Sequence, residues 1–206
     1  ELGKPLENGI EVVPQVLSKD ADEIKRFAAL CHRMGYGELN WNLGCPYPMV
    51  AKKKRGSGML PYPEMIDEIL TEALAGMPIR FSVKCRLGYL SESEFDALVP
   101  VFNRHAISEI TIHARIGKQL YSGDTNPDAF EKAMAALHAP LVYNGDVFTE
   151  ENFKQISARF PGISTFMIGR GLLSDPFLPA RIKGLTIAAN EHAHIRQFID
   201  ELYHAY

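Results

Sequence analysis

A cysteine in a tight turn is the first candidate for chemistry in this sequence. Cys45 lies between Gly44 and Pro46, directly after an apolar segment. Free cysteine is often a small buried hydrophobe, and that simpler interpretation fits Cys45 as well. The flanking glycine and proline, however, predict a fixed turn that directs the thiol outward, which favours an acid or a nucleophile. Cys31 and Cys85 fall on apolar faces of a predicted helix and strand, and we expect both to be packed in the core.

Polar side chains follow the ends of successive apolar segments. They are amides, cations and a thiol, without a pair of carboxylates: Gln15, Asn42 with Cys45, Lys84 with Arg86, His113 with Arg115, Asn144 with Asp146, and Gly169 with Arg170. This set argues against paired-carboxylate hydrolysis, and against a metal site because His113 and Asp146 lack a third ligand. Cations and amides around one cavity favour an anionic, hydrogen-bonding ligand such as a phosphorylated cofactor. The simpler alternatives are a solvated strand end for Lys84 and a hydrogen-bonded core position for His113.

One segment concentrates positive charge. Lys52, Lys53, Lys54 and Arg55 are consecutive in a chain of 206 residues whose formal net charge is −3. Such runs are usually only solvated, but this one lies between the cysteine turn and the tripeptide Gly-Ser-Gly at 56–58. We interpret it as the local patch through which an otherwise acidic chain would bind a polyanion.

The hydrophobic pattern alternates between short strands and amphipathic helices. The predicted strands are Glu11–Leu17, Glu38–Leu43, Ile79–Lys84, Glu109–His113, Leu141–Asn144 and Ser164–Ile168. The predicted helices begin at the capping boxes Asp20–Glu23 and Ser91–Glu94, or cover Tyr62–Ala75, Pro127–Leu137 and Glu150–Phe160. Pro14 is unusual for a central strand, and Pro100 should kink its helix or end it early.

Six strand-then-helix units in succession predict parallel strands, in either a doubly wound sheet or a (β/α) barrel. The polar strand ends and the turn Gly169–Gly171 before a short helix favour a TIM-type (β/α)8 barrel, and no G-x-G-x-x-G follows the first strand. Because a closed barrel has eight strands, we expect the first two βα units to be lacking here. We predict a partial barrel over residues 1–188. Over residues 189–206, helical periodicity of apolar residues predicts the start of a helical domain.

Composition excludes several classes of protein. Hydrophobic residues make up 46% of the chain and charged residues 23%, which suits a well-packed core and not disorder. No apolar run approaches the ~20 residues of a membrane span, and no signal peptide opens the chain. The chain has 3 cysteines without a C-x-x-C pair, which argues against disulfides and structural zinc. We therefore expect a cytoplasmic protein that does not bind membranes.

Five segments together resemble the tRNA-dihydrouridine synthase family. They are Glu38–Pro46 with Val50, Gly56–Gly58 and Leu60 after it, Ser82–Gly88, Thr111–Arg115, Tyr143–Val147 and Met167–Gly171. The similarity runs in register from Val13 to Pro179, and several motifs in the right order are more specific than any one of them. The resemblance implies a (β/α)8 barrel that binds FMN, followed by a helical domain that binds tRNA.

The resemblance also implies an activity and a role for each site residue. The enzyme would reduce the C5–C6 double bond of specific uridines in tRNA, using FMN that NADPH reduces. Cys45 would protonate C5 as the general acid. The isoalloxazine ring would be bound by Gln15, Lys84 and His113, and the ribityl phosphate by Asn144, Asp146, Gly169 and Arg170. The substrate would be bound by Asn42, Arg86, Arg115 and the run Lys52, Lys53, Lys54 and Arg55.

Two other functions remain open. Other FMN barrels, such as the dihydroorotate dehydrogenases, also place an asparagine and a Cys-Pro pair after a strand, and they act on a free pyrimidine. The second alternative is a barrel fragment that binds RNA or a phosphate without catalysis. It remains because the family's Ala-Pro-Met-type first strand and most of its helical domain have no counterpart here. The basic run favours tRNA, and the intact set of Cys45, Lys84 and His113 favours catalysis.

Overall fold

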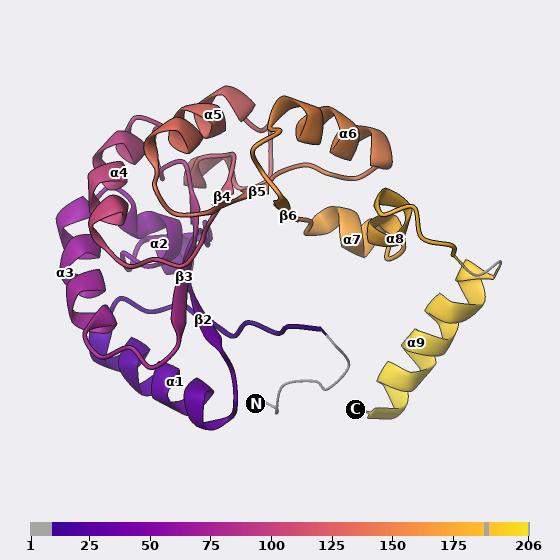
Figure 1. The fold of residues 1–206 in the computed structure, drawn as a ribbon, viewed down its shortest axis with the longest axis horizontal. Coiled ribbons are helices and arrows are strands. Elements are labelled where there is room, and N and C mark those ends of the chain that lie inside the picture. Colours follow the sequence, from indigo (N-terminus) through magenta and orange to yellow (C-terminus); the bar gives the residue numbers. More distant parts are fainter. Residues whose placement is uncertain (1–9, 188–189, 206) are drawn as a thin grey trace. The chain divides into compact units, whose positions relative to one another are not determined.

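The computed structural model describes residues 10–187 and 190–205 (Figure 1). Its parallel sheet contains, in spatial as in chain order, β1 (Gln15–Val16), β2 (Glu38–Leu43), β3 (Arg80–Arg86), β4 (Ile110–His113), β5 (Leu141–Asn144) and β6 (Thr165–Met167). The helices are α1 (Ala21–Arg33), α2 (Pro48–Ala51), η1 (Gly56–Met59), α3 (Pro63–Leu74), α4 (Glu94–Arg104), η2 (Gly117–Gln119), α5 (Pro127–Ala136), α6 (Glu150–Arg159), α7 (Arg170–Ser174), α8 (Leu178–Ile182) and α9 (Glu191–Ala205). Sequential parallel strands with helices between them are the arrangement of a TIM-type barrel, which confirms the predicted fold class.

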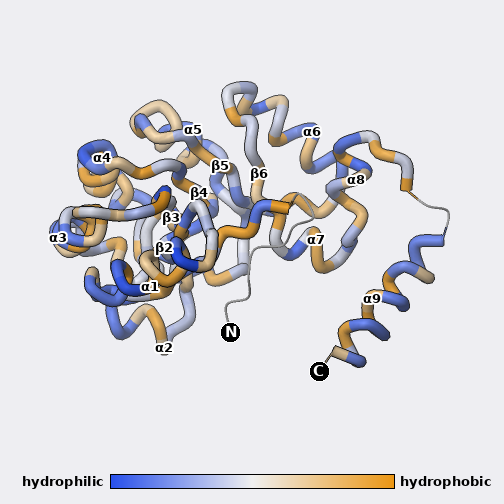
Figure 2. The backbone as a smooth tube through the Cα atoms, turned by 60° about the horizontal axis from the view of Figure 1, so that its bottom comes forward, coloured by the Kyte–Doolittle hydropathy of each residue, from blue (hydrophilic) through white to orange (hydrophobic). Residues whose placement is uncertain are grey.

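Contacts divide the described chain into two compact units. Unit 1 holds residues 10–145 and 160–167 and contains the whole sheet, and unit 2 holds residues 146–159, 168–187 and 190–205. The boundary between residues 188 and 189 that the sequence suggested stays a prediction. The expected terminal helix is present as α9, along which hydrophobic and hydrophilic residues alternate (Figure 2), while Tyr206 lies outside the described residues. None of the described helices is long and apolar enough to cross a membrane.

The strands of unit 1 have an apolar face and a polar face. Leu39, Trp41 and Leu43 of β2 are fully buried, whereas Asn40 and Asn42 are partly exposed. Successive side chains of a strand point to opposite faces, so these two sets lie on opposite sides of the sheet. Helices α1, α3, α4 and α5 lie together outside the strands (Figure 1), so the apolar face packs on the helices and the polar face lines the barrel interior.

The first strand and the capping of the first helix differ from the prediction. The first strand is limited to β1, whereas Glu11–Leu17 was expected; Pro14, which has no N–H, directly precedes it. Asp20 caps α1 as expected, accepting a hydrogen bond from the Glu23 backbone N–H at 2.8 Å. The Glu23 carboxylate, however, binds the Ser18 hydroxyl, and this hydroxyl accepts the hydrogen bond from the Asp20 N–H. Ser18 therefore bridges the Glu23 carboxylate and the Asp20 N–H, which a capping box would join directly.

The start of α4 also differs from the prediction. The expected cap, Ser91, lies outside the helix, which begins at Glu94. The Glu94 carboxylate accepts hydrogen bonds from the backbone N–H groups of Tyr89, at 2.7 Å, and Leu90, at 3.2 Å. The carboxylate therefore fixes the preceding loop and does not complete a capping box.

The prediction that Pro100 could end its helix early is wrong. Helix α4 continues past this proline to Arg104. Proline removes one hydrogen bond from a helix interior. Burial of Leu98, Val101 and Phe102 around it outweighs that loss, because each large apolar side chain contributes roughly 1.5–3 kcal/mol when buried.

Asp67 of α3 links this helix to the end of α4. Its carboxylate lies 2.7 Å from His105 Nε2 and 2.8 Å from Arg104 Nη2. The hydrogen bonds from these two side chains hold the pKa of the Asp67 carboxyl below its usual range. A carboxyl whose pKa is lowered by folding stabilises the folded state above its unfolded pKa, and the stabilisation is lost as the pH falls through its folded pKa.

We therefore predict that Asp67→Asn lowers the free energy of unfolding at pH 7 by up to about 1 kcal/mol. The difference from the wild type should shrink below about pH 4, where the unfolded carboxyl becomes protonated, and vanish at lower pH. Urea unfolding at several pH values measures this. Glu68→Gln, which changes an exposed carboxylate on the same helix, is the control and should have no such effect. A constant difference across the pH range would contradict the assignment.

Candidate functional site

Five predicted site residues lie on the interior face of the sheet in unit 1. The register pairs Asn42 with Lys84, Arg86 with His113, and His113 with Asn144. Lys84 and Arg86 are two residues apart on β3, so their side chains lie on the same face. The strand ends of β2 to β5 therefore bring these amides and cations together, as the sequence predicted.

A chain of carboxamides crosses the first three strands. The Asn42 Nδ2 group donates to Gln15 Oε1 at 2.7 Å, and Gln15 Nε2 donates to Asn40 Oδ1 at 2.7 Å. Asn40 Nδ2 in turn donates to the Ser82 hydroxyl at 2.9 Å. Neither Asn40 nor Ser82 was predicted to have a role in the site. Their spacing of two residues from Asn42 and Lys84 is the signal that would have placed them on the same face.

The cysteine turn is fixed by hydrogen bonds to its backbone. Asn42 Oδ1 accepts from the N–H groups of Gly44, at 3.0 Å, and Cys45, at 2.9 Å. The Cys45 carbonyl accepts from the Ser57 N–H at 3.0 Å and from its hydroxyl at 3.1 Å. Gly56 has φ +54°, and a Cβ there would lie 2.6 Å from the Cys45 carbonyl oxygen, so only glycine fits. Ser57, to which the sequence analysis gave no role of its own, thus helps to position the thiol.

The other two thiols are in the core, as predicted. Cys31 and Cys85 are fully buried. Burial raises the pKa of both, and that of Cys85 reaches about 12. Cys45 is partly exposed, so it is the thiol of this chain that a ligand can reach.

The Lys84 ammonium has no hydrogen-bond or ion-pair partner in the part of the chain that the structure describes. Burial lowers its pKa, and the opposing interaction with the neighbouring Cys85 does not restore it. A desolvated cation without a counter-ion is costly unless a ligand completes the site. An anionic group beside Lys84 would supply that partner.

Arg86 is fully buried and holds two loops together. Its Nε donates to the Gly44 carbonyl at 3.0 Å, and its Nη1 donates to the Ile116 carbonyl at 2.9 Å. The guanidinium carbon lies 5.4 Å from the ring centre of Tyr121, which the sequence analysis did not single out. Burial lowers the pKa of Arg86, and the interaction with Tyr121 opposes this shift. Arg86 thus ties the cysteine turn to the loop after β4.

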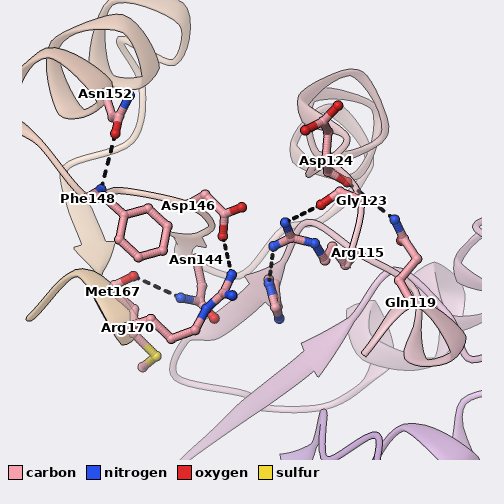
Figure 3. Close-up of polar contacts among 11 residues, drawn as sticks. Arg115, Gln119, Gly123, Asp124, Asn144, Asp146, Phe148, Asn152, Met167 and Arg170 are labelled. Carbon is pink, nitrogen blue, oxygen red and sulfur yellow. Dashed lines mark hydrogen bonds and ion pairs between the residues drawn. The ribbon is translucent and has the colours of Figure 1, made fainter. Parts of the chain in front are cut away.

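Arg115 is also fully buried, and it fixes the orientation of His113. Its Nη2 donates to the Gly123 carbonyl at 2.6 Å (Figure 3), and its Nη1 lies 3.2 Å from His113 Nε2. Because a guanidinium only donates hydrogen bonds, Nε2 is the acceptor, and the proton of the neutral imidazole is on Nδ1. The neighbouring arginine therefore determines the tautomer of His113.

The residues predicted for the phosphate end are divided between the units. Asn144 belongs to unit 1, where it donates to the Met167 carbonyl at 2.9 Å. Asp146, Gly169 and Arg170 belong to unit 2. There, Arg170 Nη2 lies 2.7 Å from Asp146 Oδ1 (Figure 3), and nothing lies within 4 Å of the position that a Cβ on Gly169 would occupy. The ion pair neutralises the carboxylate, and the backbone before α7 is open.

The structure divides the basic run into two pairs. Lys52, Lys53 and Lys54 are all exposed to solvent, but only Lys52 and Lys53 have no ring contact in the described part of the chain. Lys54, with a strained φ of +53°, places its ammonium 4.0 Å from the ring centre of Tyr62. Arg55 is partly buried, and its Nε has no hydrogen-bond partner among the described residues. Lys52 and Lys53 are therefore the cations most available to a polyanion.

The donor set of the interior fits a flat, anionic ligand with polar edges. Lys84 supplies a charge, and Gln15 and Asn42 supply amide groups beside it. In the described part of the chain, no cluster of three or more histidine, cysteine, aspartate or glutamate side chains could hold a metal ion. FMN, with its anionic and hydrogen-bonding groups, matches this chemistry.

Comparisons with known proteins agree with this chemistry. The chain matches the family described as Dihydrouridine synthase (Dus) over residues 4–202. It is 31% identical over 180 residues to the tRNA-dihydrouridine(16) synthase of Cupriavidus necator, covering 86% of this chain and 56% of that protein. It is 28% identical to tRNA-dihydrouridine synthase B of Pasteurella multocida, covering 84% of this chain and 52% of that protein. The chain thus spans little more than half the length of these two relatives.

A solved structure supports the fold. The histamine dehydrogenase of Rhizobium sp. 4-9 superimposes with a TM-score of 0.60 at 12% identity, over 80% of this chain and 27% of that one. At this identity the likeness concerns the fold alone. The match to the family over nearly the whole sequence is the stronger result, and it shows that this chain belongs to the dihydrouridine synthase family.

Proposed function

We propose that this chain forms the flavin-binding and uracil-reducing part of a tRNA-dihydrouridine synthase. Such an enzyme reduces the C5–C6 bond of a uridine in tRNA with FMN that is reduced by NADPH. The observation that carries the proposal is a partly exposed thiol, held in a fixed turn, on the same side of the barrel as the Lys84 ammonium, which has no partner among the residues that the structure describes. Family membership and the donor types of the interior support it.

The residues of unit 1 would bind the isoalloxazine ring of FMN. Lys84 would stabilise negative charge on the ring edge, and Gln15 and His113 would hydrogen-bond its polar groups. Asn144, Asp146, Gly169 and Arg170 would bind the ribityl phosphate end. When bound, FMN would supply the hydride that C6 of the uracil requires.

Cys45 would supply the proton. Hydride addition at C6 leaves negative charge along C5, C4 and O4 of the uracil, so the product requires a proton at C5. Asn42 and Ser57 fix the backbone on both sides of the thiol, which keeps it at one position. A positioned general acid of this kind contributes about 10²–10⁴-fold to the rate.

The remaining predicted residues would serve RNA binding. Lys52 and Lys53 would contact phosphates, while Lys54 and Arg55 would shape the same loop. Arg86 and Arg115 already bind backbone carbonyls, which favours positioning roles near the substrate for both. A tRNA substrate and NADPH as reductant also agree with the cytoplasmic location that the composition suggests.

The role of Cys45 is tested by Cys45→Ala. This variant should keep FMN and be reduced by NADPH at the wild-type rate, because neither step uses the thiol. Oxidation of the reduced flavin by unmodified tRNA should slow by about 10²–10⁴-fold. Anaerobic single-turnover absorbance measurements report both steps. The control is Cys31→Ala, which removes a core thiol; equal rates in the two variants would show that Cys45 is not the acid.

The role of Lys84 is tested by Lys84→Met. Losing a charge-assisted contact should weaken FMN binding by about tenfold or more, or lower the reduction potential of the bound flavin. Flavin fluorescence titration and redox titration measure these quantities. Lys25→Met, at a partly exposed position on α1, is the control and should change neither. Wild-type values for both in Lys84→Met would refute this role.

The basic run is tested by the double variant Lys52→Gln/Lys53→Gln. Each lysine that neutralises a phosphate releases counter-ions, so the slope of log affinity for tRNA against log salt should become shallower by about 2. Reduction of the flavin by NADPH should not change, because it requires no RNA. An unchanged slope in filter-binding experiments would show that these lysines are only solvated and do not bind phosphates.

A further inference from the structure

We propose that Tyr47 and Met49 form an apolar wedge that packs against a base flanking the target uridine and keeps that uridine unstacked. This inference rests on the proposed function and names the residues with which the site would open its RNA substrate. The wedge consists of these two side chains, Tyr47 at the N-cap of α2 and Met49 in its first turn, directly after the Cys45 turn.

The exposure of both side chains is high. Tyr47 is 59% exposed and Met49 is 81% exposed. Single exposed apolar residues are ordinary on protein surfaces. Here, however, two of them occur within three residues, on a turn that begins two residues after the reachable thiol.

The wedge stands on a rigid support. The Tyr47 carbonyl accepts from the N–H groups of Val50 and Ala51, both at 2.9 Å. Gly58 of η1 packs so closely against α2 that a Cβ there would lie 2.2 Å from the Ala51 carbonyl oxygen. Because η1 also holds the Cys45 carbonyl through Ser57, the wedge and the thiol share one frame.

The surrounding charge indicates RNA as the partner. Lys52 and Lys53 follow Met49 by three and four residues, and backbone hydrogen bonds continue the helical turn to Lys54. Residues at this spacing lie on one face of a helical turn. Exposed apolar or aromatic side chains beside cations are what proteins use to bind unstacked nucleic acid, with stacking for the bases and positive charge for the phosphates. A protein partner is less favoured, because lysine is depleted in protein–protein interfaces.

The reaction requires a target base that is not stacked. C5 of a uridine stacked in folded RNA is not accessible to a thiol at the end of a barrel strand, so the base must leave the stack. Leaving the stack costs free energy, and proteins offset that cost with apolar side chains such as methionine inserted at the step. Tyr47 and Met49 are the exposed large apolar side chains nearest to Cys45 along the sequence.

The test compares binding of an unmodified tRNA transcript to the wild type and to Tyr47→Ser/Met49→Gln, by filter binding at several salt concentrations. Affinity should fall by about tenfold or more, with an unchanged salt slope, because apolar contacts release no counter-ions. The Lys52→Gln/Lys53→Gln protein should show the opposite pattern, a shallower slope. Leu30→Gln, at an exposed leucine of the outer helix α1, is the matched control and should bind like the wild type.

A second measurement separates recognition from damage to the loop. Labelling of Cys45 by a thiol reagent should proceed at the wild-type rate in the wedge variant, because its frame is unchanged. Wild-type affinity for tRNA in that variant, or an altered labelling rate, would each overturn the wedge. If the wild-type protein does not bind tRNA, the proposed function is refuted together with the wedge. If the wild type and the variant bind tRNA equally well, only the wedge is refuted.

Discussion

The carboxamide of Asn42 is the group on which the rest of the site depends. Its oxygen accepts the two N–H groups that shape the cysteine turn, and its nitrogen donates into the amide chain that crosses β1 and β2. Aspartate would keep the acceptor and lose the donor, and leucine would lose both. One side chain therefore sets both the direction of the thiol and the polar surface of the interior. This explains why an asparagine stands three residues before a cysteine at the end of a buried strand.

The buried cations of the interior differ in whether they have hydrogen-bond partners in the protein. The buried guanidinium groups of Arg86 and Arg115 are bound to backbone carbonyls, so their donors are used to hold loops. Lys84, by contrast, has a desolvated charge with no partner among the described residues. Planar guanidinium groups suit fixed, multidentate structural contacts, whereas an ammonium is a point charge that a ligand can complete. A site with this division is prepared for an anion at one position.

The strands and the side chains on their faces were predictable because alternation and strand ends are local signals. Asn42, Lys84 and His113 lie where their register predicts, and the six strands occur in the expected order. The roles of Asn40, Ser57 and Ser82 were missed because they arise from partners distant in the sequence. The division of the basic run could not be foreseen either, since it depends on Tyr62 lying beside Lys54. The capping box predicted at Ser91 is wrong for a local reason, because the Glu94 carboxylate binds the backbone N–H groups of Tyr89 and Leu90 in the preceding loop.

The path of the chain between the two units has a consequence for how the protein is made. The chain leaves unit 1 after residue 145, returns at residue 160 and leaves again after residue 167. While the ribosome is still adding residues 146–159, β5 is an open sheet edge, because its neighbour β6 has not yet been synthesised. The sheet therefore reaches its final strand only after the intervening segment has emerged. During that interval the edge of β5 is exposed to edge-to-edge association, as the edge of each earlier strand is until the next strand has been made.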